Sequence, residues 1–152
     1  MSDLTSEHPE LSSHYQSDIL TFLEAGIESS GQTETLFLLI DSAIQYQHIP
    51  TLLKWCEHPA ITVGQLPDIA QKLGAEHHNV AFHLYQRAIT ETVKRTNNQA
   101  YLQTVVLLSE LKVLPAPHKE AHLHQWQRFL ATLRHNMKRK HKFIRYLDER
   151  FD

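Results

Sequence analysis

Cysteine is almost missing from this chain, since Cys56 is the only one in 152 residues. A single cysteine excludes an internal disulfide and a cysteine-based zinc site. Glycine is also scarce, at 4 residues, which argues against a turn-rich sheet fold and against a glycine loop that cradles phosphate. We therefore expect a core that is held together by apolar packing alone, in a chain long enough to bury one.

Long hydrophobic runs are missing as well, because no apolar stretch approaches the roughly 18 residues that a membrane-spanning helix needs. The first seven residues are acidic and lack the basic and apolar regions of a signal peptide. Together these absences predict a cytoplasmic protein without membrane contact.

Recognisable catalytic motifs are missing too. The sequence has no Gly-x-Ser-x-Gly, no P-loop and no paired-carboxylate motif. Cys56 and His58 lie too close in sequence to form a dyad on one helix face. We therefore expect no enzyme activity and no cofactor.

Basic residues are absent from the first third of the chain. Residues 1–53 hold eight acids and no Lys or Arg, whereas residues 54–152 hold fifteen bases and nine acids. The densest basic block carries Arg134, Lys138, Arg139, Lys140, Lys142 and Arg145. Such polarity serves an anionic partner or lets opposite ends of two molecules attract each other.

Apolar residues recur at spacings of three and four, which predicts an all-α protein. We expect helices over about 17–27, 33–47, 50–55, 66–73, 76–96 and 99–114, and two more between 118 and 151. Residues 1–16 are predicted to form a flexible acidic arm, and residues 17–152 a single α-helical domain. The expected architecture is a short solenoid or bundle of seven to eight helices in antiparallel hairpins.

One short motif occurs twice. Residues 83–89 read His-Leu-Tyr-Gln-Arg-Ala-Ile, and 41 positions later residues 124–130 read His-Gln-Trp-Gln-Arg-Phe-Leu. A period near 40 with two helices per copy is typical of stacked helical hairpins, here 76–114 and 118–151. We expect Tyr85 and Trp126 to be core residues that help to bury the apolar helix 99–114. Arg87 and Arg128 are candidates for gripping an acidic peptide or a phosphate on one concave surface.

Residues 66–151 also resemble the C-terminal helical region of bacterial SWIM zinc-finger proteins. The resemblance is carried by residues 69–73, residues 81–85, Tyr101 with residues 107–111, residues 126–134 and residues 138–140. It implies a tetratricopeptide-like helical repeat module. The family's zinc motif, a Cys-x-Cys pair followed by Cys-x-His, is absent, so zinc binding is not implied.

The basic block at 134–145 has two interpretations. As a nucleic-acid or anionic-surface contact, its bases would be interleaved with Phe143 and Tyr146. As a terminal capping helix, Phe143, Ile144 and Leu147 would form its apolar stripe. We favour the cap.

Residues 66–83 match the spacing of a helix-turn-helix, with Ala70, Gly74 and Val80 at the small, glycine and aliphatic positions. Its second helix would begin Glu-His-His-Asn and lacks Lys and Arg until Arg87, so it is a poor reader of DNA.

Twelve histidines raise the question of a metal site. His118 and His122 are spaced by one helical turn, with His124 nearby, a pattern that can chelate zinc or copper. Nothing supplies a strong further ligand, and we favour scattered surface histidines.

These observations predict a non-enzymatic protein-interaction module with a protein partner, and the opposite charges favour self-association as one form of it. The alternative is a nucleic-acid-binding protein that uses residues 66–83 or residues 134–145.

Overall fold

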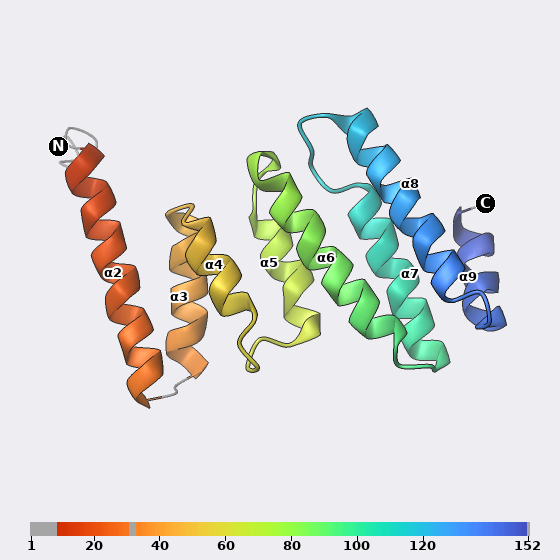
Figure 1. Ribbon diagram of the computed structural model, residues 1–152, viewed down its shortest axis with the longest axis horizontal. Helices are drawn as coiled ribbons and strands as arrows, with labels where there is room; N and C mark the ends of the chain where they lie inside the picture. Colours follow the sequence, from red (N-terminus) through yellow and green to blue (C-terminus); the bar gives the residue numbers. More distant parts are fainter. Residues whose placement is uncertain (1–8, 31–32, 152) are drawn as a thin grey trace. The chain divides into compact units, whose positions relative to one another are not determined.

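The computed structural model describes residues 9–30 and 33–151, with side chains described for residues 16–28 and 34–151. Eight α-helices and two short 3₁₀ turns make up the described residues, which contain no strand (Figure 1). The prediction of an all-α fold is confirmed. The chain divides into two compact units at residues 61 and 62.

The first unit consists of α2 (Pro9–Ser30), α3 (Thr33–Gln45) and α4 (Ile49–Cys56). α3 packs against both other helices. The core of the first unit is aliphatic because each of its helices presents leucine or isoleucine at spacings of three and four. The buried side chains include Leu20, Leu23, Ile27, Leu36, Leu39, Ile40 and Leu52.

The structure differs from two expectations about this part of the chain. Residues 9–16 belong to α2, whereas we had assigned them to a flexible arm. Their polar composition hid the helix, yet a proline is well suited to a first helical turn. The predicted single domain over 17–152 is also divided, at the loop that follows Cys56.

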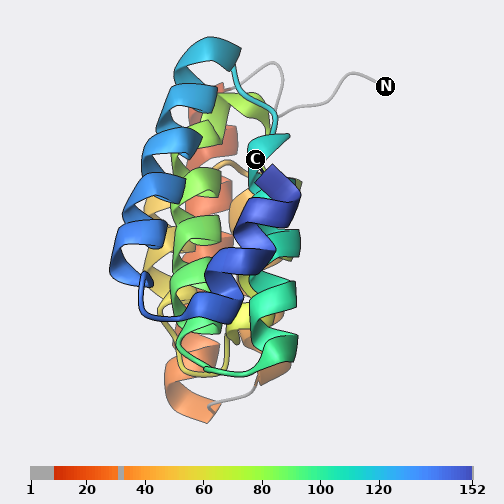
Figure 2. The ribbon, with the colours of Figure 1, turned by 90° about the vertical axis from the view of Figure 1, so that its right-hand side faces the viewer.

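The second unit contains two 3₁₀ turns and five α-helices. These are η1 (Val63–Gln65), α5 (Leu66–Lys72), η2 (Ala75–His77), α6 (His78–Val93), α7 (Asn98–Lys112), α8 (Lys119–Asn136) and α9 (His141–Phe151). Figures 1 and 2 show α6 and α8 side by side in one layer, with α7 behind them and α9 at the C-terminal end. α6 packs against both α5 and α7, and α7 packs in turn against α8 and α9.

Local signals explain where these helices begin and end. The Asn97 side chain accepts a hydrogen bond from the Ala100 backbone N–H at 2.8 Å, which caps the start of α7. The segment after α7 contains Pro115 and Pro117, which cannot continue a helix. α6 and α7 pack against each other and run in opposite directions, as an antiparallel hairpin (Figure 1).

The second predicted hairpin, over residues 118–151, forms differently. α9 packs mainly on α7 instead of on its sequence neighbour α8. Phe143 and Leu147 of α9 are fully buried, and the Phe143 ring lies 5.4 Å from that of Tyr101 on α7. α9 is therefore a closing helix that covers α7, as the cap interpretation expected.

Candidate interaction surface

The aromatic residues of the repeated motif are core residues, as predicted. Tyr85 and Trp126 are both buried, and each connects its helix to the preceding one. The Gln71 side-chain amide of α5 donates a hydrogen bond to the Tyr85 hydroxyl at 2.5 Å. The Trp126 indole N–H donates to the Leu108 carbonyl oxygen of α7 at 2.9 Å. Burial raises the pKa of the Tyr85 hydroxyl, so this group stays neutral where it meets Gln71.

The arginines of the motif do not meet in one depression. Arg87 lines a shallow hollow of about 310 Å³ on α6, with His83, Gln86, Thr90 and Glu91, and α8 contributes Phe129 to it. Arg128 is exposed on α8 and does not line this hollow. The expectation that both arginines grip one ligand on a shared concave surface is therefore not supported.

An exposed apolar row runs along α7. Leu102 and Val106 of α7 are 51% and 57% exposed, and Val113, which caps the C-terminal end of this helix, is 78% exposed. Leu102 and Val106 are spaced by four and share one face of the helix, and Val113 follows at the end of the helix. We call these three residues the α7 stripe. The repeat thus buries only part of α7, and this surface was not predicted, because a helix that is apolar nearly all round is expected to be buried on several sides.

A second row of side chains, on α9, meets the face of the stripe at Arg150. Lys142, Tyr146 and Arg150 are spaced by four, and the Arg150 Nε donates to the Ser109 hydroxyl of α7 at 3.3 Å. Ser109 lies between Val106 and Val113 on the same face of α7. Lys142 and Arg150 are exposed, and Tyr146 is half-buried. We call these residues the α9 row.

The opposite flank of α9 holds the helix in place. Asp148 forms an ion pair with Arg134 of α8, and the Phe151 ring lies 5.2 Å from the Trp126 ring. Arg134, which was a candidate binding residue, therefore connects α8 to α9.

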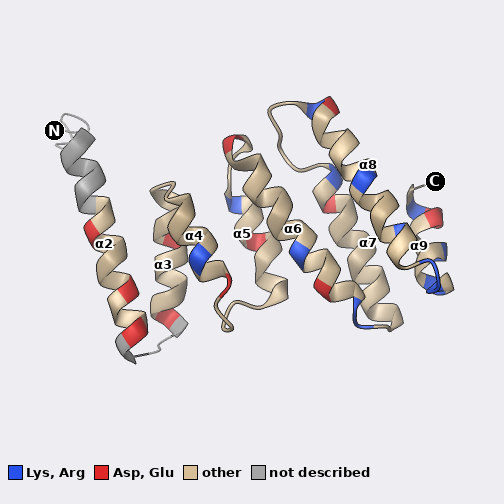
Figure 3. Cartoon of the chain, in the orientation of Figure 1, with Lys and Arg blue, Asp and Glu red and all other residues tan. Residues whose placement is uncertain are grey.

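The remaining bases of the predicted block are exposed around the α8–α9 turn (Figure 3). They are Lys138, Arg139, Lys140, Lys142 and Arg145. Phe143 points into the core, so it offers no ring on which a base could stack.

The helix-turn-helix interpretation gains no support from the geometry. α6 would be the recognition helix, yet Ala81, Phe82, Leu84 and Tyr85 are buried between its neighbours. Its exposed side carries Asn79, His83, Thr90 and Glu91. A face with an acid and without a free row of Lys or Arg lacks the donors that phosphate contacts require.

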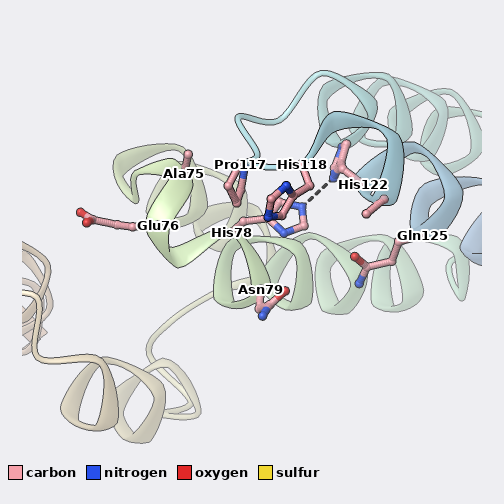
Figure 4. A pocket seen from close by; sticks show the side chains of 9 residues that line it. Ala75, Glu76, His78, Asn79, Pro117, His118, His122 and Gln125 are labelled. Carbon is pink, nitrogen blue, oxygen red and sulfur yellow. Dashed lines mark hydrogen bonds between the residues drawn. The ribbon is translucent and has the colours of Figure 1, made fainter.

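A histidine pair lies where α6, the end of α7 and the start of α8 meet (Figure 4). His78 Nε2 and His122 Nδ1 are 2.6 Å apart, and His122 Nε2 lies 2.9 Å from the Leu111 carbonyl oxygen and 3.1 Å from that of Lys112. Only an N–H approaches a carbonyl oxygen this closely, so His122 carries a proton on Nε2. The second ring nitrogen of His122, Nδ1, shares a hydrogen bond with His78 Nε2. The pair joins residues 44 positions apart and satisfies carbonyls at the C-terminal end of α7.

This pairing engages one of the three histidines that the sequence offered as metal ligands. Both ring nitrogens of His122 are occupied by protein partners, while His124 is exposed. His118 precedes α8 and lines a pocket of about 230 Å³ with His78 and His122. Across the part of the chain that the structure describes, no three His, Cys, Asp or Glu residues form a group suited to a metal ion.

The histidine pair makes stability depend on pH. Burial, followed by the nearby His122, lowers the pKa of His78 below its ordinary value near 6.5. The unfolded chain therefore binds more protons below about pH 6.5, so the free energy of unfolding is expected to fall as pH drops through this range. His78→Gln should flatten this dependence in urea titrations between about pH 7.5 and pH 5. His83→Gln removes an exposed histidine from the same helix and is the matched control. Equal slopes for the parent and His78→Gln would contradict the assignment.

Comparison with known proteins gives no relatives. No family model matches the chain, and neither the curated proteins nor the solved structures contain a significant match. No described helix is long and apolar enough to cross a membrane.

Proposed function

We propose that this protein is a non-enzymatic helical interaction module that binds a protein helix along the α7 stripe. The exposed row of Leu102, Val106 and Val113 is the observation that carries the proposal. Neighbouring apolar positions on one helix face, bordered by charged side chains, are typical of a protein-binding surface.

Charge next to the stripe narrows the kind of partner. Arg150 of the α9 row borders it through the hydrogen bond to Ser109, Lys142 is exposed on the same side of α9, and Asp148 is paired with Arg134. A partner helix with an apolar face and acidic flanks would remove the stripe from water and place its acids beside these bases. The charges would guide association, and the apolar contact would supply most of the affinity.

Site-specific photo-crosslinking in the native cell tests this proposal. A photoreactive residue at Leu102 is expected to give a discrete protein adduct, because the stripe is covered when the partner is bound. Val106→Asp in the same chain should reduce that adduct by about tenfold or more, since it places a charge in the apolar contact.

A photoreactive residue at Ala131, which is exposed on α8, is the matched control and should give no such adduct. An adduct at Leu102 that persists with Val106→Asp, or a nucleic-acid adduct, would show that the stripe is not a protein-binding surface.

A second candidate function is binding to nucleic acid through the α8–α9 turn. Five exposed bases between residues 138 and 145 support it, because clustered Lys and Arg contact phosphates independently of sequence. The buried position of Phe143 favours contacts to a phosphate backbone over stacking on single-stranded bases.

A further inference from the structure

The division into two units coincides with a division of charge. Residues 1–61 contain nine acids and one base, Lys54, for a formal charge of −8. Residues 62–152 contain fourteen bases and eight acids, for a formal charge of +6. Lys54 forms an ion pair with Glu24 at 3.0 Å, so the only base of the first unit is engaged within it.

α2 presents an apolar residue in acidic surroundings. Phe22 is 77% exposed, and Asp18 and Ala25 lie one turn away on the same exposed face. Glu28 follows on the exposed side of the helix. A large aromatic side chain left in water, with acids nearby, is the feature that the proposed function requires of a partner helix.

We propose that α2 of one copy docks on the α7 stripe and the α9 row of a second copy. The inference rests on the proposed function and names the partner as the chain itself. Phe22 would cover Leu102 and Val106, and the acids of α2 would lie beside Lys142 and Arg150. The contact is heterologous, because one copy contributes α2 and the other contributes the α7 stripe and the α9 row.

A heterologous contact makes a prediction that mixing can test. By sedimentation velocity, the wild-type protein should increase in mass with concentration at about 0.05 M NaCl and lose mass at about 0.5 M NaCl, because salt screens the charge attraction. Phe22→Glu and Val106→Asp should each weaken self-association by about tenfold or more. An equimolar mixture of the two variants should form a 1:1 dimer, since one variant keeps an intact stripe and the other an intact α2.

Matched substitutions separate this contact from a general effect of charge. Gln45→Glu in the first unit and Ala131→Asp in the second add negative charge at other exposed positions and should leave self-association unchanged. The four substituted residues are all exposed: Phe22, Gln45, Val106 and Ala131. Unchanged circular dichroism and thermal unfolding would show that the variants fold normally.

Three results would overturn the inference. The first is a wild-type protein that stays monomeric at low salt. The second is a mixture of the two variants that does not associate, because that pattern belongs to a contact between identical surfaces. The third is equal weakening by the control substitutions. The Leu102 crosslink to a foreign protein could still form in each case, so failure of self-docking is distinct from failure of the proposed function.

Discussion

Trp126→Ala is expected to lower the free energy of unfolding of the second unit by about 3–5 kcal/mol, the usual cost of removing a buried aromatic side chain. The indole ring packs against Phe151 of α9, and its N–H donates to Leu108 of α7. Truncation would therefore loosen α8 from α7 and remove one support of α9. Urea denaturation followed by circular dichroism measures the loss, and amide hydrogen exchange shows whether it is concentrated in α7, α8 and α9.

Two further substitutions in the same motif separate the ring from its neighbours. Trp126→Phe keeps most of the apolar contact and loses the hydrogen bond to Leu108, so about 1–2 kcal/mol should be lost. Arg128→Ala removes an exposed side chain two positions away and should change stability by less than about 0.5 kcal/mol. Equal effects of Trp126→Ala and Arg128→Ala would show that the repeated aromatic does not support the core.

Phe143→Ala is expected to destabilise the second unit by about 3–5 kcal/mol, because this side chain is fully buried and packs against Tyr101. α9 would lose its main anchor on α7. Hydrogen exchange should consequently rise in α9 and along the side of α7 that α9 covers. Faster hydrogen exchange in α9 and α7 would show that Phe143 holds α9 on α7. Unchanged exchange would be expected if the Phe143 side chain instead contacted a ligand.

In contrast to Phe143→Ala, substitution of the bases that precede Phe143 is expected to leave the free energy of unfolding nearly unchanged. Changing Lys138, Arg139 and Lys140 together to glutamate should leave stability nearly unchanged, because all three side chains are exposed. If the protein binds duplex DNA or RNA through this turn, the same triple variant should abolish binding at low salt and flatten its dependence on salt concentration. A parent protein that does not bind either nucleic acid would remove the second candidate function.

Sequence periodicity was sufficient to predict the helices of the second unit. The helix α7 begins after the capping residue Asn97 and ends before Pro115, so local sequence signals set both of its boundaries. The aromatic positions of the repeat were also predictable, because Tyr85 and Trp126 lie on apolar stripes. The start of α2 was missed, since residues 9–16 lack an apolar stripe and polar helices resemble loops in sequence.

The sequence by itself determined the fold class, the helices of the second unit and the opposite charges of the two ends, because all three depend on local composition and spacing. Only the tertiary structure decided which side of α7 stays exposed. That helix is apolar nearly all round, so periodicity does not identify the side that α6 and α9 cover and the side where Leu102 and Val106 face solvent. It also decided that His122 pairs with His78 instead of with His118, because contacts between residues 44 positions apart depend on how helices pack. The α7 stripe was likewise decided by the tertiary structure, because helix packing determines which side chains remain exposed.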